Sequence, residues 1–93
     1  MLVALERFDL RIPGCTSLKE KRHVVKALTG SLRSKFNVSV SEVDHQDLWQ
    51  RSQMSVVTVG SDNEYVRQTL ALALEEVERS APECVVQGNI EIV

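Results

Sequence analysis

Aromatic side chains are scarce in this sequence, and Phe8, Phe36, Trp49 and Tyr65 are the only four among its 93 residues. The core of the protein must therefore be almost entirely aliphatic. An RNA-recognition motif stacks bases on aromatic residues of a central strand, and the strand-like segment Arg51–Gly60 contains no aromatic residue. The sequence therefore excludes this mode of RNA binding.

Cysteines and histidines are equally few, and they are scattered along the chain. Cys15 and Cys84 do not form the C-x-x-C pair that a metallochaperone needs, and only His23 and His45 remain as further soft ligands. We therefore predict no metal site. Two isolated cysteines in a chain of this size are typical of free thiols in a reducing cytoplasm.

Long hydrophobic runs are absent as well. The longest, such as Leu70–Leu74, reaches five residues, whereas a membrane-spanning helix needs about 20. The first ten residues include Glu6, Arg7 and Asp9, and the apolar region of a secretory signal carries no charge. We expect a cytoplasmic protein with no membrane partner.

The sequence also lacks the common catalytic motifs. It contains no Walker loop, no G-x-S-x-G and no H-E-x-x-H. The turn Pro13–Ser17 lacks the arginine and the glycine loop with which an acylphosphatase holds phosphate. We predict that the chain is not an enzyme and that it has neither catalytic residues nor a cofactor.

Strand and helix signals alternate regularly along the chain. The S-x-x-E spacing at Ser17–Glu20 and at Ser61–Glu64 predicts two capping boxes, in which a hydroxyl and a carboxylate each accept a free N–H at a helix start. Pro13 and Pro82 mark the ends of a strand and of a helix. The predicted elements are strand 1–12, helix 17–36, strand 38–43, strand 51–60, helix 62–80 and strand 84–93.

This βαββαβ order predicts an α+β fold of the ferredoxin-like class, with one domain covering residues 1–93. Right-handed crossovers place a third strand between each joined pair, which gives a four-stranded antiparallel sheet in the order 4-1-3-2 with both helices on one face. The same connectivity brings three turns to one end of the molecule. These turns are 13–18, 44–50 and 80–83.

The two central strands of that sheet carry apolar residues on both faces. One face packs on the helices, and a face left in water is usually polar. The second face has aliphatic side chains in both strands, and we expect another copy of the chain to cover it in a homo-oligomer, with a dimer favoured. The alternative is a monomer that tolerates scattered surface aliphatics. The apolar residues of one parity are Val3 and Leu5 in the first strand and Val57 and Val59 in the third. Those of the other parity are Leu2, Ala4, Phe8, Leu10 and Ile12 in the first strand and Met54 and Val56 in the third.

The first helix is strongly basic although the chain as a whole has a net charge of −2. Four of its basic residues fall on one stripe, which has the spacing to follow a phosphate backbone; a plain solvated face is the alternative. Lys21 falls instead inside the apolar stripe. We predict that Lys21 or Arg22 pairs with Asp44 or Asp47, while Glu42 is a further acid nearby.

The loop that follows the second strand gathers side chains that stack, titrate and form hydrogen bonds. Its alternative role is to fold back, with Leu48 and Trp49 covering the core. Together with the basic helix it gives a candidate binding surface. The residues of this surface are Lys19, Lys21, Arg22, Lys26, Arg33, His45, Gln46, Asp47, Trp49 and Arg51.

Four stretches carry a resemblance to a known family. Leu10–Gly14, Ser17–Arg22, Phe36–Val43 and His45–Arg51 are similar to the corresponding segments of the YlxP-like family, which groups small bacterial proteins under a domain of unknown function. The resemblance implies a ferredoxin-like fold, a bacterial cytoplasmic protein and no assigned catalytic residue. Genes of this family often lie among those for translation and ribosome-maturation factors.

These observations lead to a functional hypothesis. We expect a non-enzymatic binding module that contacts RNA or a ribosomal particle through the basic helix and the 44–51 loop. The alternatives are a homo-oligomeric protein-interaction module and a regulatory module that senses a small anion at the start of the first helix.

Overall fold

The computed structural model describes all 93 residues, and its elements follow the predicted order. Each element begins and ends within one residue of the sequence prediction. Neither helix combines the length and the apolar character that crossing a membrane would require. The elements are β1 (Leu2–Arg11), α1 (Leu18–Lys35), β2 (Ser39–Asp44), β3 (Arg51–Gly60), α2 (Asn63–Ser80) and β4 (Val85–Ile92).

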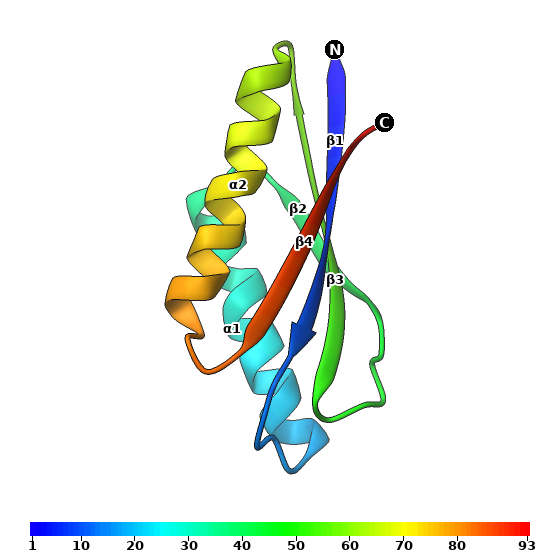
Figure 1. Cartoon of the computed structure of the whole chain (residues 1–93), viewed down its shortest axis with the longest axis vertical. Helices are drawn as coiled ribbons and strands as arrows, with labels where there is room; N and C mark the ends of the chain where they lie inside the picture. The colour runs from blue at the N-terminus through cyan, green and yellow to red at the C-terminus, as the bar shows by residue number, and fades with distance from the viewer.

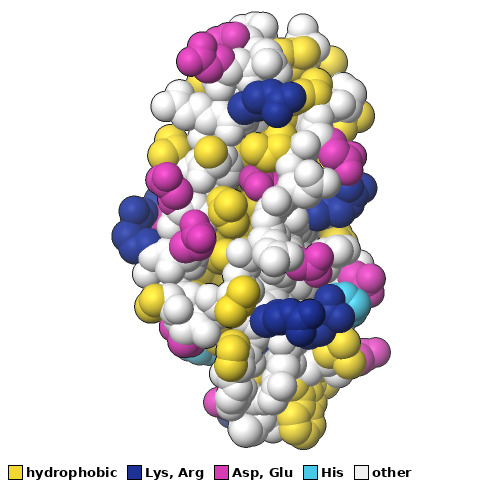
Figure 2. Space-filling model, in the orientation of Figure 1, with side chains coloured by type: hydrophobic (Ala, Val, Ile, Leu, Met, Phe, Trp, Pro, Cys, Tyr) yellow, Lys and Arg dark blue, Asp and Glu magenta, His cyan; other side chains and the backbone are white.

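The four strands form one antiparallel sheet in the order β2-β3-β1-β4, which is the predicted order read in reverse. Both helices lie on one face of this sheet (Figure 1). α2 packs against β1, β3 and β4, whereas α1 packs against β2 and α2. The predicted ferredoxin-like fold is confirmed. The surface over α2 and β4 mixes acidic, basic and hydrophobic side chains without one dominant patch (Figure 2).

The core lies between the sheet and the helices and is aliphatic, as the sequence predicts. β1 pairs with β3 over ten residues, from Leu2 opposite Gly60 to Arg11 opposite Arg51. Because side chains alternate along a strand, the even-numbered residues of both strands face the helices. The largest fully buried apolar side chains are Phe8, Leu10, Leu32, Met54, Leu70, Val56, Val66 and Val77.

The helix starts differ in detail from the predicted capping boxes. The Ser17 hydroxyl accepts the Glu20 N–H at 3.1 Å as expected, but the Glu20 carboxylate accepts the N–H of Thr16 at 3.0 Å instead of that of Ser17. The two hydrogen bonds from Thr16 lower the pKa of Glu20. At the second helix the cap is Asp62, not Ser61.

The second sheet face is only partly apolar. At one end it carries aliphatic side chains, but toward the other end it holds the ion pairs Arg7–Glu91, at 2.5 Å, and Arg51–Asp9, at 3.6 Å. The apolar area is therefore smaller than the strand patterns indicated, because charges occupy the remaining outward positions. Its members are Val3, Leu5, Val57 and Val59.

Candidate functional site

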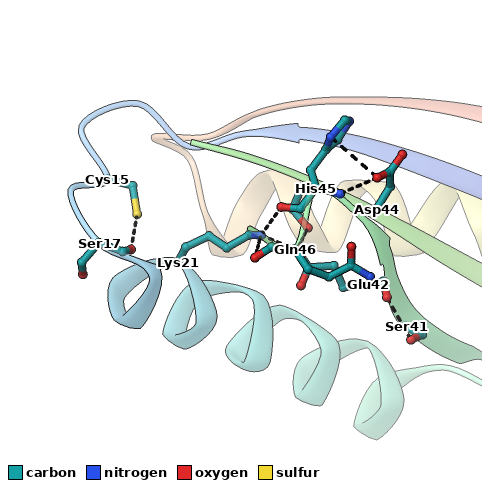
Figure 3. Close-up of polar contacts among 9 residues, drawn as sticks. Cys15, Ser17, Lys21, Ser41, Glu42, Asp44, His45 and Gln46 are labelled. Atoms are coloured by element: carbon teal, nitrogen blue, oxygen red, sulfur yellow. Dashed lines mark hydrogen bonds and ion pairs between the residues drawn. The ribbon is translucent and has the colours of Figure 1, made fainter. Parts of the chain in front are cut away.

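The start of α1 and the β2–β3 loop (residues 45–50) lie side by side, as the topology predicted (Figures 1 and 3). The Lys21 ammonium donates to the carbonyl of His45 at 2.7 Å and to that of Gln46 at 3.3 Å. The Gln50 side chain donates to the carbonyl of Cys15 at 3.2 Å, and the Gln50 carbonyl accepts the N–H of Ile12 at 3.0 Å. Polar contacts therefore hold the β2–β3 loop against the start of α1 and against the turn between β1 and α1.

Lys21 is the centre of this arrangement and is completely buried. Its ammonium forms an ion pair with Glu42 at 2.6 Å, and the same carboxylate accepts the Ser52 hydroxyl at 2.7 Å. The predicted partners of Lys21, Asp44 and Asp47, were wrong. Glu42 pairs with Lys21 because it lies on β2 opposite Met54, on the side of the sheet that faces the helices.

The burial of Lys21 also corrects the candidate surface. A side chain with no exposed area cannot contact a partner, so Lys21 is a structural residue and is removed from the surface. Arg33 is also partly engaged, because its guanidinium donates to the carbonyl of Val40 at 2.8 Å. The remaining basic residues of the stripe, Lys19, Arg22 and Lys26, are exposed and have no carboxylate partner. We call these three residues the cationic face.

The β2–β3 loop turns outward from the core. His45 has a left-handed backbone with φ of 62°, and its N–H donates to the Asp44 side chain at 2.7 Å. A turn follows, in which the N–H of Leu48 donates to the His45 carbonyl at 3.1 Å. Leu48 and Trp49 remain 46% and 50% exposed. They therefore do not cover the core, which was the alternative role expected for this loop.

A groove of about 690 Å³ lies between this loop and the end of β1. We call it the Trp49 groove. Trp49, Asp47 and Arg51 belong to the candidate surface predicted from the sequence, whereas Arg11 does not. The signal was present in the strand parity, because an odd position at the end of β1 points outward next to Arg51. The lining residues are Arg11, Ile12, Pro13, Asp47, Leu48, Trp49, Gln50 and Arg51.

A buried carboxylate between the two helices was also not predicted from the sequence. Glu76 on α2 is 2% exposed and accepts hydrogen bonds at 2.8 Å from Ser31 and Lys35 of α1. Ser80 and Arg79 donate to it from its own helix. The hydrogen bonds from Lys35, Ser31 and Ser80 lower the pKa of Glu76 to about 2. Its helical position next to the inward-facing Ala73 and Val77 was the available signal.

A second missed carboxylate lies in the core itself. Glu6 occupies an inward position of β1 between Ala4 and Phe8, and its Oε1 is buried without a hydrogen-bond partner. Burial raises the pKa of Glu6 to about 7. On β4, Gly88 leaves room for this side chain, because a Cβ at that position would overlap the Glu6 carboxyl.

The other titratable side chains form no further site. No three His, Cys, Asp or Glu side chains are grouped so as to hold a metal ion. Both cysteines are free thiols. Burial raises the pKa of Cys84, with smaller contributions from Glu83 and Cys15.

Comparison with other sequences gives a consistent result. The family described as "Protein of unknown function (DUF503)" matches residues 3–89. The uncharacterized protein YlxP of Bacillus subtilis (strain 168) is 40% identical over 67 residues, which is 72% of each chain.

Comparison with solved structures supports the fold. A de novo designed protein with ferredoxin fold has a TM-score of 0.67 at 11% identity, covering 98% of this chain and 86% of the designed one. SnoaB, a cofactor-independent oxygenase from Streptomyces nogalater, has a TM-score of 0.64 at 11% identity, with coverages of 98% and 92%. Identities this low show a shared fold and nothing about activity.

Proposed function

Since this chain belongs to the DUF503 family, whose function is unknown, we propose from its own surface that it is a non-enzymatic RNA-binding module of the bacterial cytoplasm. Its partner is RNA or a ribosomal particle. The contact surface consists of the cationic face on α1 and the β2–β3 loop beside it.

One observation carries this proposal. Three exposed cations without carboxylate partners lie on the helix whose first turns are fastened to the loop that presents Trp49. The chain as a whole has a net charge of −2, so the positive charge is local to this region. Lysine and arginine side chains that neutralise phosphates release counterions from RNA, which supplies affinity without base-specific contacts.

The polar groups of this region favour binding over catalysis. The His45 imidazole lies 3.9 Å from the Asp44 carboxylate, and no hydroxyl or thiol donates to it. A nucleophilic mechanism needs a nucleophile within hydrogen-bond reach of its base. The groups that the site does offer, which are ammonium, guanidinium and indole, are those that bind phosphates and bases.

Neutralising the cationic face is expected to reduce RNA binding and its salt dependence. For single-stranded RNA the slope of log K against log salt concentration is negative, and its magnitude decreases by about 0.7 for each phosphate that the protein no longer neutralises. Lys19→Gln, Arg22→Gln and Lys26→Gln together should therefore make this slope less steep by about 2. Filter binding to a single-stranded fragment of ribosomal RNA over a range of salt concentrations measures both quantities.

The matched control places the same change of net charge on α2. Arg67→Glu with Gln68→Glu also lowers the net charge by three, at two exposed positions of another helix. This variant should bind like the unaltered protein. If both variants bind RNA equally weakly, the effect comes from overall charge, and the cationic face is not the contact surface. If neither ribosomal RNA nor ribosomal particles bind the unaltered protein at low salt, the proposed function is wrong.

We also propose that the chain forms a homodimer through the apolar end of its second sheet face. Val59 is 46% exposed there and lies directly opposite Val3 on the neighbouring strand.

A charge at the centre of a hydrophobic interface is strongly unfavourable. We expect Val59→Glu to convert the dimer to a monomer in sedimentation velocity. Leu72→Glu, on the exposed side of α2 with 43% exposure, is the control that should remain dimeric. A monomeric unaltered protein at micromolar concentration would contradict this proposal.

A further inference from the structure

We propose that the Trp49 groove binds one unstacked nucleotide of single-stranded RNA, with its base on Trp49 and its phosphate on Arg11 and Arg51. This inference rests on the proposed function, because it takes RNA as the ligand and adds which form of RNA is bound and where. It also assigns a role to Arg11, which lies outside the cationic face.

Trp49 has the exposure that base stacking requires. Half of the side chain is accessible, and its indole N–H makes no hydrogen bond within the protein. It lines an open groove instead of packing into the core. Aromatic side chains presented in this way stack on unpaired bases of any sequence, and bases within a duplex are not available to them.

The two arginines form a pair that an anion would stabilise. Arg11 and Arg51 are direct cross-strand partners in the β1–β3 register, and both occupy outward positions. Like charges directly opposite each other on a sheet face are unfavourable. Arg51 has a carboxylate neighbour in Asp9 at 3.6 Å, but Arg11 forms no ion pair or side-chain hydrogen bond. A phosphate between the two guanidinium groups would supply the missing counterion.

The size and the surroundings of the groove suit a nucleotide. Its volume of about 690 Å³ lies within the range of roughly 300–1,000 Å³ that is usual for small-molecule sites. The groove lies at the lower end of the molecule as drawn, where Figure 2 shows Lys and Arg side chains directly beside hydrophobic ones. A nucleotide has the same combination of a charged group next to a flat apolar ring.

Asp47 argues for a nucleotide over a simple anion. It is the only carboxylate that lines the groove, and it makes the lining less favourable for a ligand that offers negative charge alone, such as an acidic peptide. A ribonucleotide, however, also carries hydroxyl groups that can donate to a carboxylate, including the 2′-hydroxyl by which proteins distinguish RNA from DNA. A ligand with both phosphate and hydroxyl groups therefore matches this lining.

The loop links this groove to the cationic face. Its first two residues, His45 and Gln46, accept hydrogen bonds from Lys21 of α1, while its remaining residues line the groove. The groove and the helix that carries the cationic face are therefore joined through Lys21 and the loop.

The experiment uses the fact that Trp49 is the only tryptophan of the chain. Its fluorescence therefore reports on this groove alone. Titration with single-stranded hexaadenylate at low salt should quench it in a saturable manner. Inorganic phosphate and a blunt RNA duplex of the same length should not. Equal quenching by phosphate would indicate a general anion site, and equal quenching by the duplex would exclude an unstacked base; either result overturns the inference.

Variants test the stacking contact by the anisotropy of a labelled hexaadenylate, which does not depend on the tryptophan signal. Trp49→Ala is expected to weaken binding about 5- to 150-fold, which corresponds to the stacking energy of one base. Trp49→Phe retains an aromatic face and should stay close to the unaltered protein. Tyr65→Ala removes an equally exposed aromatic side chain from the start of α2 and should have no effect.

The two proposals fail in different ways. If the oligonucleotide binds and requires the cationic face, but Trp49→Ala and Arg11→Gln bind normally, the groove is not a nucleotide site and the proposed function stands. If binding requires Trp49 and Arg11 but persists after neutralisation of Lys19, Arg22 and Lys26, the groove is confirmed and the helix contact is wrong. Binding of an acidic peptide in place of RNA would contradict both.

Discussion

Replacing Lys21 with methionine is expected to lower the free energy of unfolding by about 3–5 kcal/mol, because it leaves the Glu42 carboxylate without its ion-pair partner. Glu42 has a side-chain exposure of only 17%, and the ammonium that it faces is completely buried. The carbonyls of His45 and Gln46 lose their donor in the same variant. Since small domains are stable by only about 5–15 kcal/mol, the variant should be marginally folded. Urea denaturation followed by circular dichroism measures the change.

Two further variants distinguish the effect of losing the Lys21–Glu42 ion pair from the effect of losing a lysine of α1 in general. Lys26→Met changes an exposed lysine of the same helix and should stay within about 0.5 kcal/mol of the unaltered protein. In the double variant Lys21→Met, Glu42→Gln no charge remains unpaired, and the amide oxygen can still accept the Ser52 hydroxyl. It should recover part of the lost stability. A destabilisation below about 1 kcal/mol in Lys21→Met would show that water solvates Glu42 and that the buried pair is not an important contact.

The Lys21 contacts also connect stability to the proposed function. The hydrogen bonds from Lys21 hold the first two residues of the loop that presents Trp49. A buried, multiply bonded lysine is better suited to positioning a loop than to contacting a ligand, because its three donors are already used. In the proposed binding surface, Lys21 is thus a structural cation, while Lys19, Arg22 and Lys26 are exposed on the same helix.

The fold could be predicted from the sequence because several local signals agree. The alternating strands, the proline-terminated elements and the S-x-x-E spacings each define one segment, and right-handed crossovers then leave one sheet order. Even the proximity of α1 to the β2–β3 loop followed from connectivity. None of these conclusions depended on the conformation of an individual side chain.

The partners of individual side chains could not be predicted in the same way. Topology placed several acids near Lys21 but did not select one of them. Glu42 and Asp44 would share a face of a regular strand, but the register shift between them places Glu42 opposite Met54 and Asp44 opposite Gln53, on the other face. A shift of one residue exchanges the faces of a strand. At the helix starts the differences are of one residue for a comparable reason, since neighbouring polar groups there offer alternative partners. Ser17 caps α1 as predicted, but Glu20 accepts the N–H of Thr16, and Asp62 instead of Ser61 caps α2.

The two buried glutamates give the protein opposite responses to pH. Glu76 has its pKa lowered to about 2 by its donors, so its contribution to stability is present above its ordinary pKa of 4.5 and is lost as the pH falls toward 2. Glu6 has its pKa raised to about 7 by burial. The folded state then holds a proton that the unfolded chain releases, and stability falls as the pH rises from 4.5 to 7. Stability should therefore be greatest near the lower end of that interval.

Replacing Glu6 with glutamine should remove the loss of stability between pH 4.5 and 7 and stabilise the protein at neutral and alkaline pH. A difference between pKa values of about 4.5 and 7 corresponds to about 3 kcal/mol of stability lost by the unaltered protein across that interval. Glu6→Gln has no carboxyl proton to lose. Its additional stability over the unaltered protein should therefore be small near pH 4.5 and approach about 3 kcal/mol above pH 7. Urea denaturation at a series of pH values measures this difference, and Glu75→Gln at an exposed position of α2 is the control that should follow the unaltered protein. Parallel curves for Glu6→Gln and the unaltered protein would show that the Glu6 carboxyl is ionised in the folded state, and therefore that it finds in solution a donor or a water molecule that stabilises its charge.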